Sequence, residues 1–212
     1  AARKTLAGKK WRRKRTTLSR PPMVLLLPGS RVREIKNHLP LLKEFIINNN
    51  LLPAHASYIF YTLPHLVPLV KSLLGEIVVG KKISIIASVE EKWPLFLYAD
   101  LALSCLGTAT LELALSGCPT VGFYRANQLS MWVARRLINI SMAALPNILA
   151  GKKIIPELIQ QDMTVEQLTH AAQQQLTLGR KGMKKHYNRA LKSLRAVPDP
   201  ARRAADVIAR YL

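Results

Sequence analysis

Residues 23–34 read Met-Val-Leu-Leu-Leu-Pro-Gly-Ser-Arg-Val-Arg-Glu, five apolar residues followed by a turn and a charged stretch. An apolar run of this length without alternation is typical of a strand buried on both faces of a parallel sheet. Pro28-Gly29 ends the strand, and the apolar spacing over residues 34–47 predicts a helix directly after it. This strand, turn and helix form the unit from which the rest of the fold follows.

The same alternation continues to residue 124. Strands are expected at 58–61, 83–86, 101–104 and 120–124, and helices at 66–74, 94–99 and 109–116. Strands that alternate with helices in this way predict an α/β fold, a Rossmann-like parallel sheet with helices on both faces. Right-handed crossovers then place the loops that follow the strands along one edge, where such folds bind their ligands.

Beyond residue 124 the pattern predicts helices alone, with 120–124 as the last strand. These helices are expected at 128–138, 155–161, 165–178, 184–194 and 200–212. The organisation that follows is a basic N-terminal flank or linker (1–22), a Rossmann-like domain (23–162) and a set of C-terminal helices (163–212).

Composition limits the classes of protein to which the chain can belong. It has 212 residues, 49% hydrophobic and 21% charged, which excludes disorder as the main state. Only Cys105 and Cys118 are present, so a disulfide scaffold is excluded too, and the histidines show no metal-ligand spacing. The most apolar segment, 101–118, carries Glu112 in its middle and is therefore not expected to span a membrane.

The net charge of +20 favours polyanionic partners such as nucleic acid, anionic lipid or a phosphorylated substrate. It is concentrated at the two ends of the chain. Residues 1–20 hold nine Lys and Arg, and residues 180–195 hold seven, with no acidic residue in either stretch.

The turn after the first strand is the first candidate site. Gly29 and Ser30 allow backbone N–H groups to approach an anion, and the following helix adds partial positive charge at its N-terminus. Arg31 could clamp a diphosphate with two parallel hydrogen bonds. An ordinary Gly-Ser turn with a solvated arginine is the alternative, and the Gly-Lys-Ser/Thr of a Walker P-loop is missing.

Two further segments have similar features. Gly107 permits close approach of a ligand, Thr108 can cap the next helix, and Glu112 lies one turn inside it, where its carboxylate could accept two hydroxyls of a ribose. The alternative for Glu112 is that it complements the helix dipole. Asn147, in a shaped Pro-Asn-Gly loop, offers donors and acceptors to a sugar or phosphate, or is simply a turn asparagine.

Taken in order, these segments resemble the lipid-A-disaccharide synthase family. The resemblance is carried by Leu-Pro-Gly-Ser-Arg-x-x-Glu-Ile at 27–35, Gly-Thr-Ala-Thr-Leu-Glu at 107–112 and Leu-Pro-Asn-Ile-Leu-Ala-Gly-Lys at 145–152. Residues 1–8, 117–119, 124–125, 132–137 and 156–160 fit as well, so the resemblance covers almost the whole chain.

The resemblance implies an inverting hexosyltransferase of GT-B architecture, made of two Rossmann-like halves. It would transfer 2,3-diacylglucosamine from UDP-2,3-diacylglucosamine to 2,3-diacylglucosamine 1-phosphate (lipid X), giving lipid A disaccharide 1-phosphate and UDP, with no metal and no other cofactor. This chain would be the C-terminal, nucleotide-sugar-binding half. The acceptor half, or a homodimer partner, would be supplied separately, and the location would be cytoplasmic, peripheral at the inner face of the inner membrane.

By the same resemblance, Arg31 is the catalytic residue, which neutralises charge on the departing UDP. Glu157 and Gln160 would belong to a helix beside the donor site. The complete expected substrate-binding set is Gly29, Ser30, Arg31, Glu34, Gly107, Thr108, Glu112, Asn147, Glu157 and Gln160.

The sequence departs from the family pattern at Leu106, where Ser is common, and at Lys152-Lys153, where an arginine-acid pair is usual. One alternative is another GT-B UDP-sugar transferase. A second is a basic nucleic-acid-binding module, which would interleave aromatic residues with the basic clusters. Only Trp11 and Tyr187 do so, and nucleic acid is therefore not expected as a partner.

Overall fold

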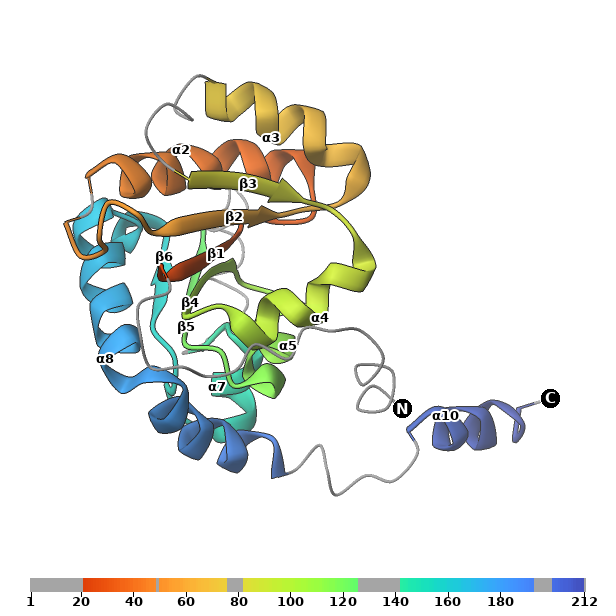
Figure 1. Ribbon diagram of the computed structural model, residues 1–212. Helices are drawn as coiled ribbons and strands as arrows, with labels where there is room; N and C mark the ends of the chain where they lie inside the picture. The colour runs from red at the N-terminus through yellow and green to blue at the C-terminus, as the bar shows by residue number, and fades with distance from the viewer. Residues whose placement is uncertain (1–20, 49, 76–81, 126–141, 193–199, 212) are drawn as a thin grey trace.

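A single sheet of six parallel strands forms the centre of the protein (Figure 1). The computed structural model describes residues 21–48, 50–75, 82–125, 142–192 and 200–211. The strands are β1 (Met23–Leu27), β2 (Ser57–Tyr61), β3 (Lys82–Ile86), β4 (Leu101–Cys105), β5 (Thr120–Tyr124) and β6 (Glu157–Ile159), in the order β3-β2-β1-β4-β5-β6. The predicted parallel α/β fold is confirmed.

Helices cover both faces of the sheet. They are α2 (Val32–Asn48), the 3₁₀ turn η1 (Pro64–Leu66), α3 (Val67–Leu74), α4 (Val89–Tyr98), α5 (Thr108–Ser116), α7 (Leu145–Ala150), the 3₁₀ turn η3 (Gln160–Asp162), α8 (Val165–Ala190) and α10 (Pro200–Ile208). Figure 1 shows α2 and α3 on one side of the sheet and α4 and α5 on the other.

The chain changes sides between β1 and β4, which are neighbours in the sheet. The helix that follows β1 packs on one face, where Ile35 and Leu39 join a core cluster with Val24. The helix that follows β4 packs on the opposite face, where Leu113 joins Leu25 in a second cluster. The loops after β1 and β4 therefore diverge at the carboxyl edge of the sheet. This is the topological switch point of a doubly wound fold, where such folds bind ligands in a crevice.

The expected helix over 155–161 is wrong. Residues 157–159 form β6, which extends the sheet beside β5, and residues 160–162 form η3. The Gly122 N–H donates to the Pro156 carbonyl at 2.9 Å, which begins the pairing. A three-residue strand has too little periodicity to be recognised locally, because the partner strand supplies its hydrogen bonds.

Helix α8 merges two of the expected helices, 165–178 and 184–194, across a kink at Gly179. Gly179 has φ 58° and ψ 179°, a left-handed backbone that suits glycine. Before the kink, Leu168 packs into the core on the α2 side of the sheet, and after it Met183 and Tyr187 pack with α7 on the other side. The kink redirects α8, so its second part packs on the face of the sheet that α5 covers.

The final helix, α10, ends at Ile208, earlier than the expected 212. The expected helix 128–138 and nearly all of the basic flank lie outside the described residues. Among the residues that the structure describes, no helix is both long enough and apolar enough to cross a membrane.

Candidate functional site

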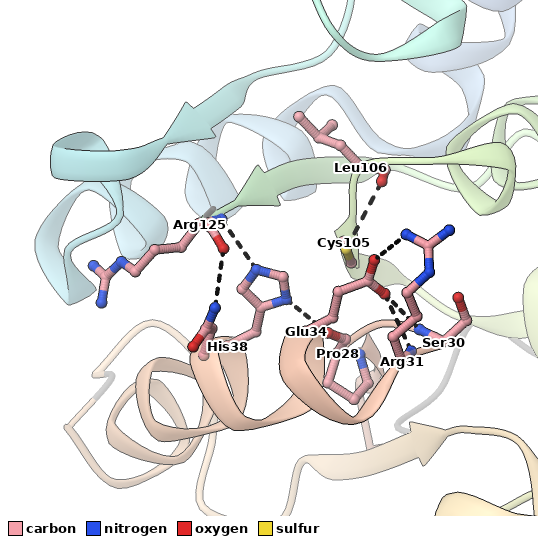
Figure 2. A network of polar contacts seen from close by, with 9 residues as sticks. Pro28, Ser30, Arg31, Glu34, His38, Cys105, Leu106 and Arg125 are labelled. Atoms are coloured by element: carbon pink, nitrogen blue, oxygen red, sulfur yellow. Dashed lines mark hydrogen bonds and ion pairs between the residues drawn. The ribbon is translucent and has the colours of Figure 1, made fainter. Parts of the chain in front are cut away.

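Two of the three segments singled out in the sequence border the crevice at the switch point. β1 and β4 pair in register up to Leu27 and Ser104, so the turn after β1 and the loop after β4 leave the sheet side by side. Figure 2 shows Arg31 and Glu34 beside Cys105 at this edge, with the side chain of Leu106 pointing away from the turn.

Glu34 closes the turn after β1 upon itself. Its Oε2 accepts the backbone N–H groups of Ser30 at 2.9 Å and Arg31 at 3.3 Å, and its Oε1 accepts Arg31 Nη1 at 3.1 Å (Figure 2). These N–H groups were expected to face an anionic ligand. In the structure the carboxylate of Glu34 takes that position, as a capping side chain does at a helix N-terminus.

Gly29 is required by this arrangement. Its φ is +130°, and a Cβ built on it would lie 2.5 Å from Glu34 Cβ and 2.7 Å from Glu34 Oε2. Any larger residue would therefore push Glu34 away from the turn. The side chain of Glu34 is 13% exposed and that of Arg31 78%, so the Arg31 guanidinium lies at the surface with Nη1 paired to Glu34.

The second loop presents an open helix N-terminus. The N-cap of α5 is Gly107, with no side-chain hydrogen bond at the cap, and Thr108 is the first helical residue rather than the cap that was expected. Thr110 Oγ1 and the Thr110 N–H both donate to the Gly107 carbonyl, at 2.7 and 3.2 Å, and glycine has no side chain to accept from the first N–H groups of the helix. Gly107 and Thr108 are both exposed. Backbone N–H groups in this setting favour a phosphate.

Glu112 forms an ion pair with Lys92 of α4, a residue that the sequence analysis missed. Lys92 Nζ lies 2.8 Å from Glu112 Oε1 and 2.7 Å from Oε2, and both side chains are about 30% exposed. The two residues are twenty positions apart in the sequence, so no local pattern predicts the contact. Burial, then the charges of Glu112 and Glu90, raise the pKa of Tyr61 at the end of β2, so its hydroxyl remains a hydrogen-bond donor at neutral pH.

Asn147 is fully buried, and its amide is used within the protein. Its Oδ1 accepts the N–H groups of Ile154 at 2.7 Å and Ile155 at 2.9 Å, and its Nδ2 donates to the Ile155 carbonyl at 2.9 Å and to Glu157 Oε1 at 2.7 Å. Glu157 in turn accepts the N–H of Ala144 at 2.8 Å, before α7. The expected ligand contacts of Asn147 are therefore replaced by contacts that shape the loop.

Leu106 joins this third segment to the second loop. It packs in a cluster with Ala144 and Ile155, and its Cδ2 fills the space that a Cβ on Gly122 would need. Leu106 therefore has a packing role at this position, where the sequence was expected to depart from the family pattern. Asn147 thus shapes the segment against which Leu106 packs.

Gln160 lies after β6, two strands from the switch point. Its φ is 57°, the one positive value among the described non-glycine residues. Its Nε2 is buried and has no hydrogen-bond partner in the described part of the chain. Strain and an unpaired amide in one residue are features that functional sites often carry.

The two cysteines, Cys105 at the end of β4 and Cys118 before β5, are not activated thiols. Burial raises the pKa of Cys105 to about 12 and that of Cys118 to about 12, so both thiols stay protonated. The described ranges contain no cluster of three or more His, Cys, Asp or Glu side chains that could hold a metal ion.

Solved structures with the same fold define the class. Acinetobacter baumannii MurG superposes with a TM-score of 0.53 at 16% identity, covering 91% of this chain and 50% of that one. WaaG, a glycosyltransferase involved in lipopolysaccharide biosynthesis, gives 0.53 at 16% identity over 89% of this chain and 47% of its own. A UDP complex of an S. aureus TarM mutant gives 0.55 at 10% identity, covering 81% and 32% of the two chains. The sheet is thus one half of a GT-B glycosyltransferase fold.

Sequence comparison narrows the class to one family. The Lipid-A-disaccharide synthetase family model matches residues 4–210. The Nitrobacter hamburgensis lipid-A-disaccharide synthase is 33% identical over 193 residues, 89% of this chain and 48% of that protein. The Nitrosococcus oceani enzyme is 37% identical over 143 residues, 68% and 36% of the two chains. The chain belongs to the lipid-A-disaccharide synthase family, as predicted, and spans about half the length of these relatives at most.

Proposed function

We propose that the chain is the donor-binding half of a lipid-A-disaccharide synthase. It binds UDP-2,3-diacylglucosamine, and the sugar is transferred to 2,3-diacylglucosamine 1-phosphate, which releases UDP. One observation carries the proposal: an exposed arginine follows β1 and an open helix N-terminus follows β4, the neighbouring strand at the switch point of the sheet. Two converging sources of positive charge suit a diphosphate.

Arg31 acts on the leaving group. When the bond between the sugar C1 and the diphosphate breaks, negative charge develops on the departing UDP, and an arginine at that point lowers the energy of the transition state. The open N-terminus of α5 at Gly107 and Thr108 contributes in the same direction. Ser30 and Glu34 hold the turn in the conformation that presents Arg31.

Glu112 receives the hydroxyls of the ribose, with Lys92 orienting its carboxylate. Each carboxylate oxygen has a second lone pair beyond the one that faces Lys92, so two hydroxyls can be accepted at once. Asn147 and Glu157 position the loop before α5. Gln160 contacts the sugar-nucleotide donor, and its buried amide without a hydrogen-bond partner among the described residues supports this role. The Rossmann-like domain, residues 23–162, contains this site, and residues 163–212 form the C-terminal helices.

The acceptor and the general base belong to the half that this chain does not span, or to a partner that supplies it. Residues 1–22 would connect the two halves. The net charge of +20 suits anionic lipid substrates and a peripheral place at the cytoplasmic face of the inner membrane, where cationic side chains raise the local concentration of the protein.

Calorimetric titration with UDP tests the donor site. Arg31→Ala should weaken UDP binding by roughly tenfold or more, since a charged hydrogen bond to phosphate is lost. Arg33→Ala, two residues along in an equally exposed position, is the matched control and should leave the affinity within about twofold. Equal effects of the two substitutions would refute the role of Arg31.

A second measurement tests the donor-half assignment. The chain alone should release no UDP from UDP-2,3-diacylglucosamine and lipid X, while a mixture with the amino-terminal half of a relative should do so. Turnover by the chain alone would show that it contains its own acceptor site.

A further inference from the structure

His38 lies beneath the turn that carries Arg31 and is fully buried, although it is an ionisable residue. It stands one turn of α2 beyond Glu34, on the side that faces the end of β5. Its ring makes an edge-on contact with Phe123, with centroids 5.2 Å apart, and a tilted contact with Tyr124 at 5.7 Å. These two ring contacts, together with complete burial, hold the imidazole in one orientation.

Both ring nitrogens are used, and the two partners define the protonation state. Nδ1 lies 2.7 Å from the Pro28 carbonyl, which can only accept, so Nδ1 carries a hydrogen. The Arg125 N–H donates to Nε2 at 3.0 Å, so Nε2 carries a lone pair (Figure 2). His38 is therefore the neutral Nδ1–H tautomer, and a proton on Nε2 would break the second hydrogen bond.

We propose that His38 is a positioning residue, which ties the Pro28–Arg31 turn to the end of β5 and thereby holds the turn in place for the diphosphate of the donor. The proposal rests on the proposed function. The Pro28 carbonyl immediately precedes Gly29, so a displacement of Pro28 moves the whole turn. On the other side, Asn37 Nδ2 donates to the Arg125 carbonyl at 3.4 Å, so one turn of α2 holds both polar groups of the residue after β5.

The charges around the ring agree with a neutral imidazole. Burial lowers the pKa of His38 from 6.5, and the charge of Arg125 at the end of β5 acts in the same direction. Glu34, on the same helix, and the hydrogen bonds to Pro28 and Arg125 oppose this shift without overcoming it. The connection is therefore intact at neutral pH and opens in acid.

Three substitutions separate the two hydrogen bonds. The amide of asparagine reaches about as far as Nδ1, and that of glutamine about as far as Nε2. His38→Asn should thus keep the hydrogen bond to Pro28, His38→Gln the one from Arg125, and His38→Met neither. Tyr187→Phe is the matched control, since it removes a buried 2.9 Å hydrogen bond to the Cys118 carbonyl remote from the turn.

Amide hydrogen exchange by NMR on the full chain tests the positioning directly. His38→Met should raise the exchange rates of Ser30, Arg31 and Arg125 by roughly tenfold or more, and Tyr187→Phe should leave them unchanged. A ¹⁵N spectrum of the wild-type ring should show the Nδ1–H tautomer at pH 7. Unchanged exchange rates, or a charged or Nε2–H ring, would overturn the proposal whether or not UDP binds.

Titration with UDP then tests the link to function. Affinity should fall by roughly tenfold in His38→Met, less in His38→Asn than in His38→Gln, and not at all in Tyr187→Phe. Below pH 6.5, wild-type affinity should fall more steeply than that of His38→Asn, which has no imidazole and shares the titration of UDP itself. If His38→Met loosens the turn yet binds UDP as well as wild type, the link fails. If wild type binds no UDP, the proposed function fails, and the exchange rates still decide whether His38 holds the turn.

Discussion

Glu34 and Asn147 show, at the scale of single residues, how polar side chains can shape a site without lining it. In each residue one side-chain oxygen accepts two backbone N–H groups of a nearby turn, those of Ser30 and Arg31 in one case and of Ile154 and Ile155 in the other. Their contribution to a ligand site is a fixed backbone. Arg31, by contrast, keeps most of its surface open to solvent.

Replacement of Asn147 should therefore act on stability. Asn147→Ala removes the side-chain partner of three buried backbone groups, those of Ile154 and Ile155, and one of the donors to Glu157. We expect the free energy of unfolding to fall by about 3 kcal/mol. Ile148→Ala is the control, since Ile148 is 49% exposed on the same helix, and should change stability by about 0.5 kcal/mol or less. Urea unfolding followed by circular dichroism measures both. A loss below about 1 kcal/mol for Asn147→Ala would contradict the buried network.

The lowered pKa of His38 predicts how stability depends on pH. Between pH 6.5 and the lower folded pKa, the unfolded chain binds a proton that the folded chain does not, so stability declines as pH falls. The limiting slope is about 1.4 kcal/mol per pH unit. On acidification from pH 7 to 5, the free energy of unfolding should therefore fall more in wild type than in His38→Asn. Parallel stability profiles would show that His38 keeps an ordinary pKa in the folded chain.

At the scale of elements, Arg180 joins α8 to the ends of two helices. It follows the kink at Gly179, and its guanidinium donates to the Ser116 carbonyl at 2.9 Å and to the carbonyls of Phe96 and Ala99 at 2.7 Å. These are the last carbonyls of α5 and α4, which lack intrahelical partners. One positive charge of the 180–195 cluster is therefore structural rather than available to a polyanion.

Arg180→Met should lower the free energy of unfolding by about 2–4 kcal/mol, because three charge-assisted hydrogen bonds are lost from helix ends that carry partial negative charge. Lys181→Met, at the exposed neighbouring position, should change it by about 0.5 kcal/mol or less. Chemical unfolding of the two variants in parallel measures both changes in the free energy of unfolding. Equal, small effects would mean that packing alone holds α8 in place.

At the scale of the whole molecule, the charge of +20 predicts attraction to anionic membranes that salt weakens. Vesicles with phosphatidylglycerol should bind the chain at low ionic strength and release it at about 0.5 M salt, where the Debye length is only a few ångströms. Neutral phosphatidylcholine vesicles are the control. UDP affinity should fall only modestly over the same range, and retention on neutral vesicles would point to an apolar surface instead.

The amino-acid sequence by itself determined the alternation of strands and helices and the two turns beside the switch point. Both are local: buried strands appear as short apolar runs, and a glycine turn before a helix can be recognised from neighbouring residues. The ordered motifs also indicated the family, because they extend over nearly the whole chain.

Only the tertiary structure decided the pairing of β6 with β5 and the partners of the polar side chains. β6 exists because β5 offers it hydrogen bonds, Glu112 meets a lysine twenty residues earlier, and His38 meets a backbone N–H 87 residues later. Such contacts depend on how the chain returns to the same edge of the sheet. Their energy comes from desolvated groups brought together by folding, and no short stretch of sequence records that proximity.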